Sequence, residues 1–472
     1  MGLLTTKPVA VLQAEAELAG EAPGGLRRVL GPVDLTLLGV GAIVGLGGVA
    51  LTGYMASNVA GPAVSLAFLL AGLAASLAAL CFAELAGALP SSGGPYAWAY
   101  AGLGELPAWL VAWSLLLEYL LGAATVAEGW SQHLLALAGE VRGLPPAQPP
   151  RALVDALAVA LVVVLTGALL AGTRAAARVN AALAVAKLLA LLAVVVGGLL
   201  AVDAANWRPF VPPPDGAGRF GWPGVWSATG AVFFAYIGFD TIAVAAAEAR
   251  HPRRDVPRAT LAALIGCATL YVLTALVVTG TRRFRPADQV DPIGAVVGAL
   301  GGPPWAALAT RGALVVGLSG VVLVLLLAGG RVLFAMARDG VLPPALGRVH
   351  PRTGAPRAAT LLAGGTAAVT VLAPVTHTGD VVTVGALVVF LAVCVSFLAL
   401  RRRRPTLERP FRVPAGEVVA GLGAVVAALL LVVTGRGALP VFGAWLFGGL
   451  LLYFGYGQAH SRVRRVAAAA AD

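Results

Sequence analysis

Long apolar runs separated by short polar segments dominate the chain. A run of roughly 18–25 apolar residues is enough for a helix to cross a bilayer. We therefore expect an all-α polytopic membrane protein, with a membrane domain at residues 31–460 and tails at 1–30 and 461–472. The pattern predicts about twelve spans, near residues 33–56, 62–88, 106–138, 152–172, 179–202, 226–249, 257–280, 308–337, 358–375, 380–400, 415–435 and 438–458.

Two of the expected spans are interrupted in their middle. The first break is glycine-rich, GVGAIVGLGG (residues 39–48), and the second lies in the sixth span, FFAYIGFD (233–240). Non-helical backbone at membrane depth is tolerated only where protein buries it or where it lines a polar cavity. In transporters, such breaks bind small solutes through the free N–H and C=O groups of half-helices. The two breaks therefore point to solute transport.

The spacing of the breaks also predicts internal symmetry. Interruptions five spans apart are the expected sign of an inverted repeat, with the binding site where the repeats meet. We place repeat one at about 31–202, repeat two at about 220–400 and two accessory helices at about 413–458. The polar segment PSSGGPYAWAYAGLGE (90–105) is expected to form either a short interfacial helix or an amphipathic loop.

Composition and charge support the same class. Charged residues make up only 12% of the 472 residues, about half of their share in soluble proteins. The net charge of +11 could suggest a nucleic-acid partner, but most of the 33 Lys and Arg residues fall on one side of the expected topology. This is the positive-inside pattern, so we expect cytoplasmic termini, contact with membrane lipid and no nucleic acid. The three cysteines and five histidines lack metal-ligand or catalytic spacing, so no metal, cofactor or enzyme activity is expected.

Four strings carry a resemblance to a known family. They are GVGAIVGLGGVALTG (39–53), LEYLLGAATVAEGWS (117–131), FFAYIGFDTIAVAAAEARHPRRDVP (233–257) and RVLFAMARDGVLPPALGRVHP (331–351). They resemble bacterial members of the cationic amino acid transporter family, within the amino acid–polyamine–organocation superfamily. The resemblance implies a fold of five-plus-five inverted repeats with two extra C-terminal helices. It also implies amino acid uptake across a bacterial plasma membrane, commonly coupled to protons.

An amino acid substrate needs partners for its carboxylate and its ammonium, because dehydrating either group is costly. Free N–H groups around Gly45–Gly47 can bind the carboxylate at a half-helix N-terminus, and carbonyls freed near Phe234 and Ile237 can accept from the ammonium. The alternative for the glycines is close helix packing. The predicted substrate site comprises Ile43, Gly45, Leu46, Gly47, Ala123, Phe234, Ala235 and Ile237.

The first break departs from the family pattern. Family members have Gly-Thr-Gly-Ile-Phe where this chain has GLGGV (45–49). The missing threonine hydroxyl removes a possible contact to substrate, and Gly48 is expected to loosen the break further. The choice between a cationic and a neutral amino acid therefore stays open.

Two ionisable residues within the spans are candidates for proton coupling. Lys187, one of only two lysines, lies roughly 12 Å into the membrane, where burial disfavours its charge. In sodium-coupled relatives of this fold a cation lies between spans 1 and 8, and the resemblance suggests that the Lys187 ammonium takes its place. The alternative is snorkelling to the headgroups. Glu118 is the candidate for contact with a cationic substrate or a coupled proton, whereas Glu84 and Glu248 are expected to pair with loop arginines.

Other transport functions are alternatives to proton-coupled amino acid uptake. An amino acid exchanger or a polyamine carrier of the same superfamily is the main alternative. A polyamine has no carboxylate, so it would depend on acidic residues of the pocket rather than on the N–H groups after the first break. The sequence leaves the oligomeric state open.

Overall fold

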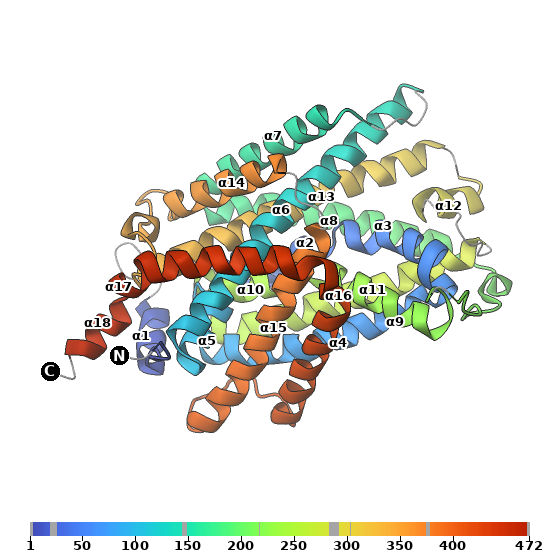
Figure 1. The fold of residues 1–472 in the computed structure, drawn as a ribbon. Helices are drawn as coiled ribbons and strands as arrows, with labels where there is room; N and C mark the ends of the chain where they lie inside the picture. Colours follow the sequence, from blue (N-terminus) through green and yellow to red (C-terminus); the bar gives the residue numbers. More distant parts are fainter. Residues whose placement is uncertain are drawn as a thin grey trace.

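The computed structural model is a bundle in which most helices run back and forth along one direction (Figure 1). It describes residues 3–18, 26–143, 149–216, 218–282, 292–302, 304–373 and 378–469. Within these ranges, ten helices are long and apolar enough to cross a membrane, beside two shorter apolar helices, Pro32–Ile43 and Arg357–Leu372. The same ranges contain no β-strand, as expected where lipid cannot satisfy backbone hydrogen bonds. The prediction of an all-α polytopic membrane protein is confirmed.

The helices follow the expected spans closely. The segment 90–105 contains the short helix α5, whose residues are all buried, so the expectation of a helix rather than a loop is confirmed. The helices are α1 (Val9–Leu18), α2 (Pro32–Ile43), α3 (Leu46–Met55), α4 (Val64–Ala88), α5 (Pro95–Gly102), α6 (Glu105–Val141), α7 (Arg151–Leu170), α8 (Thr173–Leu199), α9 (Gly221–Val232), α10 (Asp240–Val244), α11 (Pro252–Thr281), α12 (Pro292–Ala299), α13 (Pro304–Arg338), α14 (Arg357–Leu372), α15 (Thr378–Arg403), α16 (Gly416–Leu452), α17 (Gln458–His460) and α18 (Arg462–Ala469).

The last two expected spans are present as two candidate membrane spans, Gly416–Thr434 and Gly437–His460. Residues 416–452 form the single helix α16, which bends between its two halves (Figure 1). Pro440 lies inside this helix. Because proline has no backbone N–H and its ring clashes with the preceding turn, it bends a helix without ending it here.

Both predicted breaks are present. The first separates α2 from α3 at Val44 and Gly45, and the second separates α9 from α10. The breaks touch, because a Cβ added to Gly238 would lie 2.7 Å from the Cβ of Ala42. Gly238 also has a φ of +120°, which side chains rarely tolerate. Glycine at this position therefore lets the two interrupted helices meet.

The terminal helices α1 and α18 lie at one end of the bundle, which we call the terminal end (Figure 1). The Lys7 ammonium lies 2.6 Å from the Asp339 carboxylate, and the backbone N–H of Arg462 donates to the Asp339 carbonyl. Glu105, at the start of α6, lies 2.8 Å from the guanidinium of Arg464. Both tails therefore lie on the same side of the bundle, as the charge pattern predicts.

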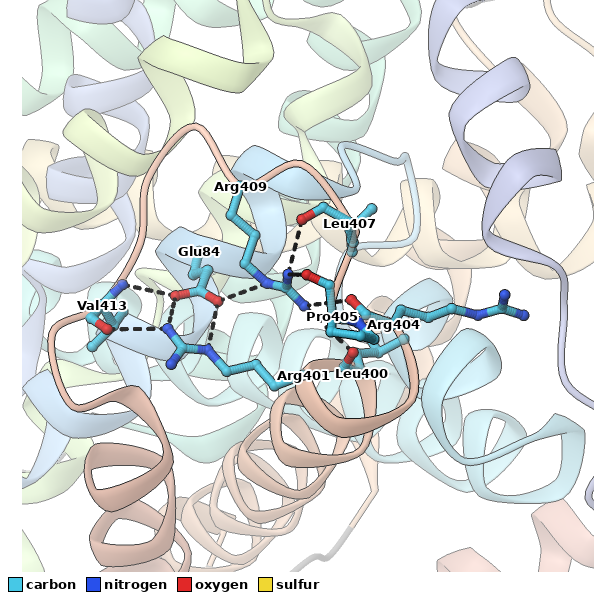
Figure 2. Close-up of polar contacts among 8 residues, drawn as sticks. All are labelled: Glu84, Leu400, Arg401, Arg404, Pro405, Leu407, Arg409 and Val413. Carbon is cyan, nitrogen blue, oxygen red and sulfur yellow. Dashed lines mark hydrogen bonds and ion pairs between the residues drawn. The ribbon is translucent and has the colours of Figure 1, made fainter.

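Glu84 holds the accessory helices to the bundle at α4. Figure 2 shows its carboxylate between two guanidinium groups. It accepts from Arg401 at 2.6 and 3.0 Å and from the backbone N–H of Val413 at 2.7 Å, and it lies 3.1 Å from Arg409. The prediction that Glu84 pairs with arginines is confirmed, and these contacts fix the connection between α15 and α16.

Glu248 is also paired, but not with a loop residue. Its carboxylate accepts from Arg331 of α13 at 2.5 Å, and Thr173 of α8 donates to it. The expectation of a loop arginine was wrong here, because α13 carries its own arginine into the protein interior.

Candidate substrate site

A small cavity lies between the two breaks. Its volume is about 30 Å³, roughly the space of two water molecules. An amino acid does not fit in this volume, so the site has to widen before substrate enters. The cavity is lined by Ala42, Ile43, Gly45, Glu118, Gly122, Val126, Phe234, Ala235, Ile237, Val321, Leu325 and Val382.

Most of the predicted site residues line this cavity. Ile43, Gly45, Phe234, Ala235 and Ile237 do so, together with Glu118. The remaining predicted residues lie close by: Leu46 and Gly47 begin α3 directly after the break, and Ala123 is buried next to the lining residue Gly122.

Side chains from neighbouring helices hold the carbonyl end of α2. Lys187 of α8 donates from Nζ to the carbonyls of Gly41 and Val44, both at 2.6 Å. The hydroxyl of Tyr271 in α11 donates to the carbonyl of Ile43 at 2.7 Å. These bonds satisfy acceptors that a broken helix leaves free.

Lys187 does not snorkel to the headgroups. Its side chain is only 1% exposed. Its stem packs against Gly317 of α13, where an added Cβ would lie 2.5 Å from the Lys187 Cβ. The ammonium therefore lies at the end of α2 with the stem against α13, the eighth expected span. This is where the resemblance suggested it would lie.

The glycines of the first break have different roles. An added Cβ at Gly41 would lie 2.3 Å from the Asn180 side chain, and one at Gly48 would lie 2.0 Å from the ring of Tyr271. Both positions therefore serve close packing, as the alternative interpretation proposed. At Gly45 the nearest atom, from Val321, would be at an ordinary 3.5 Å. Packing does not require glycine at this position.

Gly48 has a structural reason that the sequence did not reveal. Its missing side chain leaves room for the Tyr271 ring, whose hydroxyl holds Ile43. The departure from the family pattern thus supports the break rather than loosening it.

The residues missed from the sequence fall into two groups. Tyr271 and Asn180 are polar residues inside apolar spans, a signal that could have identified them. Asn180 donates to the carbonyl of Leu37 at 2.9 Å. The second group is small or aliphatic and carries no distinguishing signal; it comprises Ala42, Gly122, Val126, Val321, Leu325 and Val382.

Comparison with known proteins gives the family. Residues 30–447 match the family described as amino acid permease. The chain belongs to this family. The resemblance found in the sequence is thereby confirmed, and the protein is a multi-pass membrane permease rather than an enzyme.

Relatives of this permease differ in cargo. It is 36% identical to a branched-chain amino acid permease of Bacillus subtilis (strain 168), over 93% of this chain and 95% of that one. It is 33% identical to a methylthioribose transporter of the same organism, over 98% and 99% of the two chains. It is also 36% identical to the vacuolar cationic amino acid transporter 4 of Arabidopsis thaliana, over 81% of this chain and 65% of that one.

The permease carries an unsatisfied acid at its cavity. Glu118 is fully buried, and neither carboxylate oxygen has a hydrogen-bond partner within the described part of the chain. Nearby Asp240 accepts from Tyr119 through one oxygen, while its other oxygen has no partner there. Buried polar groups are nearly always satisfied in native proteins. The Glu118 carboxyl is therefore arranged to receive a proton, a cation or water.

The start of α3 follows directly after the held end of α2. Gly45 precedes α3 in an extended conformation, and no side chain caps the helix. The first N–H groups of a helix have no partner within it and carry a partial positive charge. The start of α3 can therefore bind a carboxylate without any cationic side chain.

Proposed function

We propose that the protein takes up amino acids across a bacterial plasma membrane by proton-coupled alternating access. The observation that carries this proposal is the cavity itself, which brings the uncapped start of α3, the second break and the unpaired Glu118 together. Each half of a zwitterionic amino acid finds a complementary group there. The cavity has to widen before an amino acid enters, and this widening is one step of the transport cycle.

Substrate recognition rests on backbone groups. The N–H groups at Gly45, Leu46 and Gly47 bind the α-carboxylate, and carbonyls at Phe234, Ala235 and Ile237 accept from the α-ammonium. The Phe234 carbonyl already accepts from the Ile237 N–H at 3.2 Å, but a carbonyl oxygen has a second lone pair. Ile43 and Ala123 contribute to the apolar wall.

The substrate side chain meets a mainly aliphatic surface. Val126, Val321, Leu325 and Val382 face the cavity together with aromatic Phe234. Such a wall favours an apolar side chain, because a hydrophobic pocket gains from the apolar area it buries. We therefore expect a branched aliphatic amino acid to be preferred over a cationic one.

Proton coupling rests on Lys187 and Glu118. The protonated Lys187 donates two charge-assisted hydrogen bonds to carbonyls at the end of α2, and the neutral amine donates more weakly. Loss of its proton therefore weakens the hold on the first break. The Glu118 carboxyl, on the cavity wall, exchanges the second proton or contacts the substrate cation.

We propose the same division into repeats and accessory helices that the sequence predicts. We assign repeat one to about 31–202, repeat two to about 220–400 and the accessory helices to about 413–458, with both termini cytoplasmic. The meeting of the two breaks and the shared location of both tails support this arrangement.

An amino acid exchanger or a polyamine carrier is the second candidate. The unpaired Glu118 favours the polyamine, because an unsatisfied buried carboxyl binds a cation well. The start of α3 favours the amino acid, because a polyamine has no group for an anion site.

Uptake into proteoliposomes tests the proposal. A pool of radiolabelled leucine, alanine, lysine and arginine is supplied with and without an inward proton gradient, and spermidine is tested separately. Accumulation that collapses with the gradient supports symport, whereas uptake only into preloaded vesicles supports exchange. Uptake of spermidine alone supports the polyamine carrier and overturns the amino acid assignment.

A further inference from the structure

A second, larger pocket shares no lining residue with the substrate cavity. Its volume is about 280 Å³, close to the lower end for small-molecule sites, roughly 300–1,000 Å³. Three separate segments form it: the approach to α2, the turn between α7 and α8, and the loop before α14. It is lined by Arg27, Val29, Ala171, Gly172, Thr173, Arg174, Ala175, Arg352 and Thr353.

The lining is strongly cationic. Each of the three segments contributes one arginine, Arg27, Arg174 or Arg352, and no lining residue is acidic. Arg27 donates to the carbonyl of Pro351 at 2.9 Å. In the described part of the chain, Arg174 and Arg352 take part in no ion pair. Three arginines line this one pocket, which has no acidic lining residue, and together they create a local attraction for an anion.

The helix that enters the pocket adds to this field. Thr173, Arg174 and Ala175 are the first residues of α8, a helix of 27 residues whose start has no side-chain cap. The start of a helix carries a partial positive charge, which favours anions. The helix start and the three arginine side chains therefore all attract an anion.

We infer that this pocket binds a phosphate group, either free phosphate or the headgroup of an anionic phospholipid. Guanidinium groups bind phosphate through paired hydrogen bonds, and several arginines around one group recognise it specifically. Basic pockets between membrane helices are suited to anionic headgroups. Free phosphate and a phospholipid headgroup would be bound by the same arginines.

An occupant would connect segments that already meet at Glu248. Val29 donates from its backbone to the Glu248 carbonyl at 2.9 Å, and Thr173 donates to its carboxylate. A phosphate held by arginines from all three segments stabilises the arrangement in which they lie together. Binding is therefore measurable as thermal stabilisation of the whole protein.

The test uses the full chain, purified and delipidated in a neutral detergent. Its unfolding temperature is measured against inorganic phosphate, short-chain phosphatidylglycerol and short-chain phosphatidylcholine, each compared with sodium chloride at equal ionic strength. We expect saturable stabilisation by phosphatidylglycerol, by inorganic phosphate or by both, and none by phosphatidylcholine. Stabilisation by inorganic phosphate identifies free phosphate as sufficient; stabilisation by phosphatidylglycerol alone identifies the lipid.

Matched double variants locate the site. R174Q/R352Q removes two pocket arginines, and R254Q/R402Q removes two exposed arginines outside the pocket. Each basic group near an anion contributes about a factor of five in affinity, so R174Q/R352Q should bind roughly 30-fold more weakly, while R254Q/R402Q matches the parent. Stabilisation no greater than that by sodium chloride would overturn the inference. So would an R174Q/R352Q variant that is stabilised like the parent.

Discussion

Two buried glutamates of this permease have opposite surroundings. Glu84, in α4, is held by Arg401, Arg409 and the backbone of Val413 (Figure 2). Glu118, in α6, has no hydrogen-bond partner for either oxygen among the described residues and faces the cavity. Both are fully buried, so exposure does not distinguish them.

This difference in hydrogen-bond partners indicates a structural role for Glu84 and a functional role for Glu118. A buried charge is stable only when partners replace its water, and Glu84 has its full set. Glu118 has no hydrogen-bond partner among the residues that the structure describes, which is a cost that natural proteins accept mainly at functional sites. Its partner is therefore expected to come from outside the fold, as a proton, water or substrate.

Glu84→Gln tests the paired side of the comparison and should have the largest effect. Removing one member of a buried ion pair leaves the other charge uncompensated, at a cost of about 3–5 kcal/mol in the free energy of unfolding. Glu408→Gln is the control, because this residue is 74% exposed and pairs with Arg253 at the surface, where a pair contributes at most about 1 kcal/mol. Thermal unfolding measures both; equal stability of the two variants would contradict the assignment.

Lys187→Ala extends the comparison to a buried ammonium that donates its hydrogen bonds to backbone carbonyls. We expect proton-driven accumulation to be lost, together with about 1–3 kcal/mol of stability for each carbonyl left unsatisfied. Gradient-driven uptake and thermal unfolding are measured in parallel. Lys7→Ala, at the other lysine of the chain, is the control. Normal coupling in a folded Lys187→Ala variant would remove this residue from the mechanism.

Glu118→Gln tests the unpaired side. Because the carboxylate accepts no hydrogen bond from the described residues, the free energy of unfolding should change by less than about 1 kcal/mol or increase. The response of uptake to the proton gradient should be lost, since the amide cannot exchange a proton. Glu128→Gln, on the same helix and only partly buried, is the matched control. A strongly destabilised Glu118→Gln protein would show that this carboxyl has a structural partner.

Gly45→Ala should alter binding without altering the fold. The new methyl group meets Val321 at an ordinary 3.5 Å, but it narrows the approach of the substrate carboxylate. We expect KM to rise about tenfold, equal to about 1.4 kcal/mol. Gly238→Ala should instead destabilise the protein because of its φ of +120° and its contact with Ala42. An unchanged KM for Gly45→Ala would exclude the carboxylate site at α3.

Lys7→Gln should have an effect confined to the N-terminal segment, because Asp339 keeps its hydrogen bond from Tyr96. Burial opposes the charge of Lys7, but Asp339 and Glu15 outweigh it and raise its pKa above 10.5. A raised pKa means that the stabilisation is complete at neutral pH and is lost only as the pH rises through the pKa of the folded state. Limited proteolysis of this segment should therefore be faster in the variant at neutral pH, by about 1 kcal/mol of local stability. Wild-type protection that decreases already near neutral pH would contradict the ion pair.

The sequence located the breaks but not the contacts that hold them. Several glycines within an apolar run indicate a break in a membrane helix, because non-helical backbone is tolerated there only at buried or cavity-lining positions. The same pattern could not separate Gly41 and Gly48, which make room for Asn180 and Tyr271, from Gly45, which does not. That distinction depends on side chains from α8 and α11.

By itself, the sequence determined the membrane spans, both breaks, the family and half of the residues that line the cavity. These follow from apolar length, glycine placement and motifs, which are local properties of the chain. Only the tertiary structure decided that Glu84 is satisfied and Glu118 is not, that Lys187 holds the end of α2, and that three arginines from distant segments share one pocket. The physical reason is that the free energy of a buried charge depends on the partners that packing brings to it, and these partners lie far away along the chain.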